Sequence, residues 1–192
     1  TGANIYHWLG RTIEALGVTK KISALHEEED SWEDAVRWRM EGHVAVLRVY
    51  VDARNVDQVR RIGTEAFAII QEYERRLSPL TSNQNKMLRS FCHNMGLPLR
   101  GAQQYDLALP MLERAVKLGM KSPWTYLSLA AALWATTKDK DIVLPLLKHA
   151  ALNYPIVPIW DEHSRPLEFA DVADDPDFLA AVTLPTGIAA SQ

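Results

Sequence analysis

The side chains that most often perform chemistry in proteins, histidine and cysteine, are few and scattered in this chain of 192 residues. The six histidines stand at positions 7, 26, 43, 93, 149 and 163, so no two are four residues apart, as they are in a zinc-protease helix. No phosphate loop and no Gly-x-Ser-x-Gly motif occurs. The sequence therefore predicts no catalytic residue, no metal ligand and no cofactor, and it argues against an enzyme.

Two acidic runs and one thiol are the remaining candidates for chemistry. Residues 26–30, His-Glu-Glu-Glu-Asp, fit a metal site, a site for a basic partner or a solvated loop. We interpret them as a solvated loop. The aspartates of residues 171–177 lack the glycine and the final glutamate of a calcium loop, so we expect them to cap a helix. Cys92 is the only cysteine, which excludes an internal disulfide and suits a reducing compartment. We interpret it as a small core residue.

The bulk properties restrict the class of partner. The net charge of −3 and the lack of a basic face exclude a nucleic-acid footprint. No apolar run approaches the ~20 residues that a membrane-spanning helix needs. We therefore expect a cytoplasmic protein without a membrane or nucleic-acid partner. Its first residue is Thr1 rather than Met, so we also expect that it can be part of a longer protein.

An internal repeat indicates which elements would position a binding surface. Residues 109–115, Leu-Pro-Met-Leu-Glu-Arg-Ala, reappear thirty-five residues later as Leu-Pro-Leu-Leu-Lys-His-Ala at 144–150. Ala108 and Ala115 are two helical turns apart and share one face, and Gly96 lies in a helical pattern before them. Small residues at such places let two helices pack near the ~8 Å end of the usual distance range.

The two copies resemble the tetratricopeptide repeat, a helix–turn–helix unit of roughly 34 residues. The matching residues are Met95, Gly96, Leu99, Tyr105, Ala108, Leu112 and Ala115 in the first copy and Tyr126, Leu129, Ala130, Leu133, Leu147 and Ala150 in the second. Cys92 departs from the bulky aromatic residue that the family often has there. Pro110 and Pro145 either bend their helices slightly, which is our interpretation, or act as hinges for a ligand.

Helical periodicity and capping residues extend this organisation over the chain. We expect capping helices within residues 1–30, a long helix pair over 31–78 as a possible degenerate repeat, and repeats over 83–121 and 122–154. Residues 155–183 resemble the closing segment of some bacterial arrays and would end in a short helix from Pro176, and 184–192 would be a disordered tail. The predicted fold is all-α: an antiparallel helix-pair solenoid with short capping helices at both ends.

The inner faces of the two long helices follow from the spacing of their apolar residues. The first helix is expected to run from a Ser31 capping box to Asp52, with Ala35, Trp38, Val46, Val49 and Tyr50 inward. The second is expected to start after an Asn55 cap and to run from Val56 to Leu77. Its predicted inner face consists of Val59, Ile62, Gly63, Ala66, Ile69, Ile70 and Tyr73.

In the family that the repeats resemble, the first helix of each unit lines a concave binding face. The resemblance places on this face Ser90, His93, Asn94, Leu97 and Arg100, then Trp124, Leu127, Ser128, Ala131 and Trp134, and from the looser pair Glu41, Arg48 and Asp52. Asn94 stands where many peptide-binding members hold a ligand backbone. Trp124 and Trp134 either anchor a partner on this face or pack into the core.

The resemblance implies a non-catalytic scaffold or adaptor, which binds a segment of a partner protein or peptide on the concave face. A second hypothesis is a regulatory or sensory module of a larger, possibly bacterial, protein that binds an internal segment or a small ligand. An enzyme would require His93 beside a carboxylate in a closed pocket. The partner and the oligomeric state are not specified by the sequence.

Overall fold

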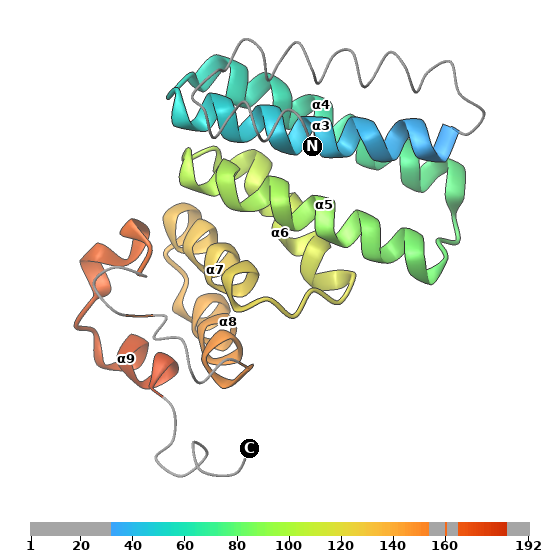
Figure 1. Cartoon of the computed structure of the whole chain (residues 1–192). Helices are drawn as coiled ribbons and strands as arrows, with labels where there is room; N and C mark the ends of the chain where they lie inside the picture. The colour runs from blue at the N-terminus through green and yellow to red at the C-terminus, as the bar shows by residue number, and fades with distance from the viewer. Residues whose placement is uncertain (1–31, 154–159, 161–164, 184–192) are drawn as a thin grey trace.

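The computed structural model describes residues 32–153, 160 and 165–183, and every regular element within these residues is helical (Figure 1). Three helix pairs follow one another: α3 (Trp32–Asp52) with α4 (Val56–Leu77), α5 (Ser82–Gly101) with α6 (Tyr105–Lys117), and α7 (Pro123–Thr137) with α8 (Lys140–Asn153). A 3₁₀ helix, η1 (Leu167–Val172), and a short helix, α9 (Pro176–Val182), complete the described part. The all-α prediction is thereby confirmed, whereas the expected capping helices within 1–30 and the tail at 184–192 lie outside the described residues.

Helix α4 confirms the prediction that was made from its apolar spacing. It begins after Asn55, whose side chain accepts a hydrogen bond from the backbone N–H of Gln58 at 3.2 Å. Its buried residues are the predicted Val59, Ile62, Gly63, Ala66, Ile69, Ile70 and Tyr73. Because one wide apolar stripe faces the core, the opposite face of α4 is left to charged side chains.

Helix α3 ends at the predicted residue, but its inner face was predicted only in part. Val46 and Val49 are buried as expected, whereas Ala35, Trp38 and Tyr50 keep intermediate exposure. Val36, Met40 and Leu47 are buried in their place. Helix α3 packs against α5 as well as α4, and this contact with a helix farther along the chain does not follow from the apolar spacing of α3 alone.

Helix α5 occupies the centre of the helix array. It begins with a capping box in which the Thr81 side chain accepts from the Gln84 backbone while the Gln84 side chain accepts from the Thr81 backbone. It contacts α3, α4, α6 and α7. Position 96 requires glycine, because a β-carbon there would lie 2.7 Å from Cγ and Cδ2 of Leu112 on α6. The predicted close approach of two helices at Gly96 is thus confirmed.

The two repeated prolines lie at equivalent places in the structure. Pro110 is the sixth residue of α6 and Pro145 the sixth residue of α8, and both helices continue through them. The repeated leucine and alanine, Leu112 with Ala115 and Leu147 with Ala150, are fully buried. The repeat therefore marks the same packed helix face in two successive pairs.

Two apolar clusters fill the interior. The larger one joins α3, α4, α5 and α6 and includes Leu129 of α7. The smaller one joins α7 and α8 to Phe169 of η1 and Phe178 of α9. Nine of the fifteen residues of α7 are buried, so this helix is covered on most sides. Among the described helices, none combines the length and the apolarity needed to cross a membrane.

We expect Gly96→Ala to lower the free energy of unfolding by about 1–3 kcal/mol, because the new methyl group overlaps Leu112. Gly101→Ala is the matched control in the last position of α5, where a β-carbon meets no atom within 4 Å. That substitution should raise the stability by about 0.4–1 kcal/mol by restricting the unfolded chain. Urea titrations of both variants give the measurement, and equal effects would show that α5 and α6 are not closely packed at Gly96.

Candidate functional site

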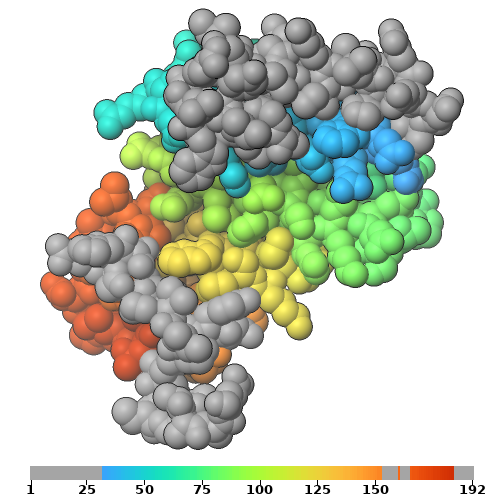
Figure 2. All heavy atoms as spheres, in the orientation of Figure 1, coloured from blue at the N-terminus to red at the C-terminus, as the bar shows by residue number. Residues whose placement is uncertain are grey.

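A groove of about 680 Å³ lies between α3 and α5. Its apolar lining comes from three helices, with Met40 and Val44 on α3, Tyr73 on α4, and Met87 and Phe91 on α5. Figure 2 shows the face on which blue atoms of α3 border green atoms of α5. The volume lies within the range of about 300–1,000 Å³ that binding pockets usually have.

One row of polar side chains runs along the α5 wall of this groove. Lys86, Ser90 and Asn94 follow one another at intervals of four residues and therefore lie on one helical face. The row extends about 12 Å at 1.5 Å per residue, which matches roughly four residues of an extended chain. Arg48 lines the groove from α3. Arg48, Ser90 and Asn94 are three of the predicted concave-face residues, and the structure brings them together.

Within the described part of the chain, the carboxylates of Glu33 and Glu41 at the groove have partners, whereas the cations Arg48 and Lys86 do not. The Glu33 carboxylate accepts a hydrogen bond from the Gln84 amide, and Glu41 pairs with Arg37 at 3.5 Å. Neither Arg48 nor Lys86 forms an ion pair with another described residue, and the side chains of Ser90 and Asn94 form no hydrogen bond within the same part of the chain. The groove therefore offers unused donors and positive charge beside an apolar floor.

His93, the fourth predicted residue on α5, holds two helices together instead of lining the groove. Its Nδ1 lies 2.7 Å from Oγ1 of the fully buried Thr125 on α7, and the two atoms share a hydrogen bond. Burial, reinforced by the positive charge of Arg48, lowers the pKa of His93 below its ordinary value. No carboxylate partner of His93 is present among the described residues, so the arrangement that an enzyme would have required is not found there.

The last two predicted residues of α5 face other parts of the protein. Leu97 is partly buried and packs against the larger apolar cluster. Arg100 Nη1 lies 3.1 Å from the nearer oxygen of Glu168 in η1, and only 8% of the Glu168 side chain is exposed. Arg100 is therefore already paired within the chain and is not free to meet a partner's carboxylate in this state.

The predicted face on α7 is largely covered. Leu127, Ser128, Ala131 and Trp134 are 5% exposed or less, because α7 lies between the other helices and the C-terminal elements. The Trp134 ring packs edge-on against Phe178 with centroids 5.0 Å apart. Trp124 in the first turn of α7 is 39% exposed. The structure thus assigns Trp134 to the core and Trp124 to the surface, and it leaves Ser128 inaccessible.

Sequence reasoning missed the apolar floor of the groove, Lys86 and the role of Glu168. Met87 and Phe91 are four residues apart and alternate with Ser90 and Asn94, a pattern that could have indicated a half-apolar groove wall. Asp175 caps α9 as predicted, accepting from the backbone N–H of Asp177 at 3.0 Å. The ion pairs of this acidic run were missed, although Lys138 and Lys140 stand at the α7–α8 turn.

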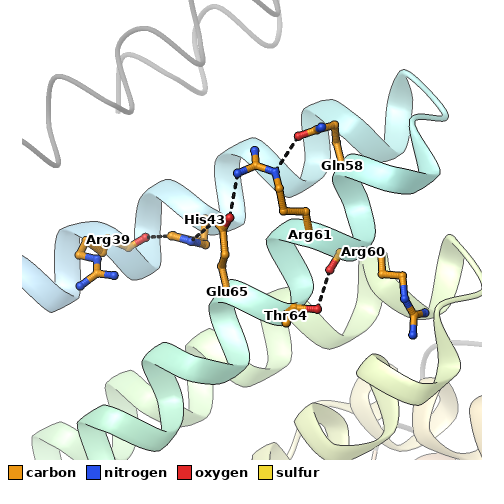
Figure 3. A network of polar contacts seen from close by, with 7 residues as sticks. All are labelled: Arg39, His43, Gln58, Arg60, Arg61, Thr64 and Glu65. Carbon is orange, nitrogen blue, oxygen red and sulfur yellow. Dashed lines mark hydrogen bonds and ion pairs between the residues drawn. The ribbon is translucent and has the colours of Figure 1, made fainter.

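A second polar cluster lies on α3 and α4 (Figure 3). His43 Nδ1 lies 2.8 Å from the Arg39 carbonyl oxygen, and His43 Nε2 lies 3.4 Å from a Glu65 oxygen. Arg61 donates to the other Glu65 oxygen at 2.8 Å and to the Gln58 side chain. In the described part of the chain, no three histidine, cysteine or carboxylate side chains gather as metal ligands. This cluster is a satisfied surface network.

Cys92 is fully buried in the larger cluster, as interpreted from the sequence. Burial raises the pKa of its thiol to about 12, so the thiol stays protonated at neutral pH. A thiolate nucleophile is therefore not available at this position.

Comparisons with known proteins identify no relative. No protein-family model matches the chain, and neither a curated protein nor a solved structure is significantly similar to it. The functional argument therefore depends on the geometry of the α3–α5 groove and of the C-terminal elements.

The lowered pKa of His93 has a consequence for stability. At a pH below 6.5, the ordinary pKa of histidine, His93 of the unfolded chain binds a proton that the folded chain resists. The free energy of unfolding therefore decreases as the pH falls from 6.5 through the lowered pKa of the folded state. We expect the wild-type melting temperature to fall more between about pH 7.5 and about pH 5.5 than that of His93→Gln, which cannot be protonated there. Calorimetry of both proteins at both pH values measures this difference, and identical losses would exclude His93 as the cause.

Proposed function

We propose that the chain is a non-catalytic interaction module with a tetratricopeptide-like helix array, and that it binds an extended segment of a partner protein in the groove between α3 and α5. The observation that carries the proposal is a set of polar side chains beside an apolar floor, Ser90, Asn94, Lys86 and Arg48, which have no hydrogen-bond or ion-pair partner among the described residues. Ligand sites typically combine a concave apolar lining with a few polar groups that fix the orientation of the ligand.

The arrangement of the helix pairs supports the repeat-like part of the proposal. Alternate helices contact each other, α3 with α5, α5 with α7 and α4 with α6, which is the pattern of stacked helix pairs. Small residues lie where pairs approach closely: a β-carbon at Gly63 would lie 2.9 Å from Leu107, and Ala108, Ala115 and Ala150 are fully buried. In such an array the first helices of successive pairs share one face, and α3 and α5 supply all the described lining residues of the groove except Tyr73 of α4.

The chemistry of the groove specifies the kind of segment that fits. Apolar side chains of the partner would contact Met40, Met87 and Phe91, while Asn94 and Ser90 would hydrogen-bond its backbone. Lys86 and Arg48, which form no ion pair with another described residue, favour a carboxylate near each end of the contact. A short, apolar segment flanked by acidic residues meets these conditions.

The test is selection of peptides from a random displayed library on the intact chain, followed by affinity measurements with Arg48→Ala/Asn94→Ala. We expect this double variant to bind the selected peptides at least about tenfold more weakly, because it lacks one charge-assisted and one neutral hydrogen bond, together worth about 2 kcal/mol or more. Isothermal titration calorimetry gives the dissociation constants.

The matched control is Arg39→Ala/Gln71→Ala, which removes the same kinds of group from exposed positions outside the groove. This control should bind the peptides as the wild type does. Peptides whose affinity is unchanged by the groove variant, or lowered equally by the control, would place the interaction surface elsewhere.

A further inference from the structure

The C-terminal residues 165–183, here called the closing segment, dock on the end of the α7–α8 pair. Figure 1 shows η1 and α9 beside α7 and α8, at the end of the array opposite to α3 and α4. Phe169 and Phe178 are the apolar anchors, since both are fully buried among residues of α7 and α8. Val172, Ala181 and Val182 pack against the same cluster, whereas Leu167 and Leu179 are 85% and 39% exposed.

Carboxylates of the closing segment meet cations and an indole at the α7–α8 turn. Asp171 accepts from Trp134 Nε1 at 3.1 Å and from Lys138 Nζ at 2.9 Å. Lys140 Nζ lies 2.7 Å from Asp175 and 2.9 Å from Asp177. The hydrogen bonds from Lys138 and Trp134 hold the pKa of Asp171 below its ordinary value. Each carboxylate of this group therefore faces a donor on the helix array.

Glu168 makes the deepest of these contacts, and its geometry leaves donors unused. The Tyr105 hydroxyl donates to Glu168 at 3.2 Å, and a single Arg100 nitrogen, Nη1, faces both carboxylate oxygens at 3.1 and 3.5 Å. Arg100 Nε is buried and has no hydrogen-bond partner in the described part of the chain. An arginine that is fully matched to a carboxylate uses two nitrogens in parallel. Glu168 thus pairs with Arg100 but leaves the Nε donor of this arginine unused.

The two helices of the closing segment are too short to be stable on their own. Its helices contain six and seven residues, whereas isolated helices shorter than about 12–15 residues are marginal in water. Its order therefore comes from docking, as it does for a flexible peptide that folds on a binding surface. The hydrogen-bonding part of the surface that orders it consists of Arg100, Tyr105, Trp134, Lys138 and Lys140, here called the end face.

We propose that the end face is a recognition site for acidic protein segments that bear aromatic side chains, and that the closing segment occupies this site in cis. Three cations with an indole and a phenol donor fit this class of segment, and the closing segment shows the fit with Glu168-Phe169 and Asp177-Phe178. A partner segment of the same chemistry binds when it displaces the closing segment. This inference does not depend on the function of the α3–α5 groove.

The closing segment is part of the same chain as the end face, and this covalent connection determines how strongly a partner segment must compete for the end face. A segment joined to its own site by a short linker has an effective concentration in the millimolar range. A free peptide with the same contacts is therefore excluded from the wild-type protein at micromolar concentrations. Weakening the cis contacts opens the site, and an identical peptide in trans then becomes a detectable ligand.

The experiment uses the full chain and a fluorescein-labelled peptide of residues 165–183. The double variant Glu168→Gln/Asp171→Asn should bind the peptide at least about tenfold more tightly than the wild type does, because its own segment competes less well. Asp174→Asn is the matched control, since Asp174 is an exposed carboxylate of the same segment and is not among the residues that pair with the end face. This control should behave as the wild type does in fluorescence anisotropy.

A second peptide, with residues 168, 171, 175 and 177 changed to amides, should lose at least about tenfold in affinity for the double variant. If the folded double variant binds the first peptide no better than Asp174→Asn does, the proposal is wrong. Should the double variant not fold, the single Asp171→Asn decides, because the Asp171 side chain is 54% exposed and its loss is mild. Equal binding by Asp171→Asn and Asp174→Asn would then show that the closing segment is an inseparable part of the core.

Discussion

The close packing of α5 against α6 at Gly96 is the constraint on which the rest of the structure depends. Leu112 fills the space that any larger residue at position 96 would need, so the position of α5 relative to its partner is fixed. Each functional feature then derives from a different part of α5. Ser90 and Asn94 form a groove wall, His93 reaches α7, and Arg100 reaches the closing segment. One rigid helix thereby connects two candidate interaction surfaces.

Local patterns in the sequence predicted the buried face correctly where one wide apolar stripe keeps the helical spacing. All seven inner residues of α4 followed from helical spacing, and Asn55 and Asp175 act as the caps that their positions indicated. The repeat correctly marked Ala115 and Ala150 as packed residues. Arg48, Ser90 and Asn94 come from the first helices of adjacent pairs and line one groove.

The sequence was insufficient where burial depends on segments that are distant along the chain. Trp134 packs against Phe178, which is 44 residues away, and donates a hydrogen bond to Asp171, which is 37 residues away. Arg100 meets Glu168 across 68 residues. No helical period of α5 or α7 contains these contacts, so an exposed concave residue and a covered one look alike in a single sequence. The prediction of the inner face of α3 missed Val36, Met40 and Leu47, which pack in the larger cluster with residues of the distant helices α5 and α6.

The position of Phe169 and Phe178 near the C-terminus has a consequence for biosynthesis. Translation proceeds from the N-terminus, so α7 and α8 emerge from the ribosome before the two rings that cover their shared apolar cluster. Until Phe178 is available, the incomplete chain exposes apolar surface of the kind that chaperones and proteases recognise. Synthesis of α9 therefore completes the cover of an apolar surface that would otherwise favour aggregation.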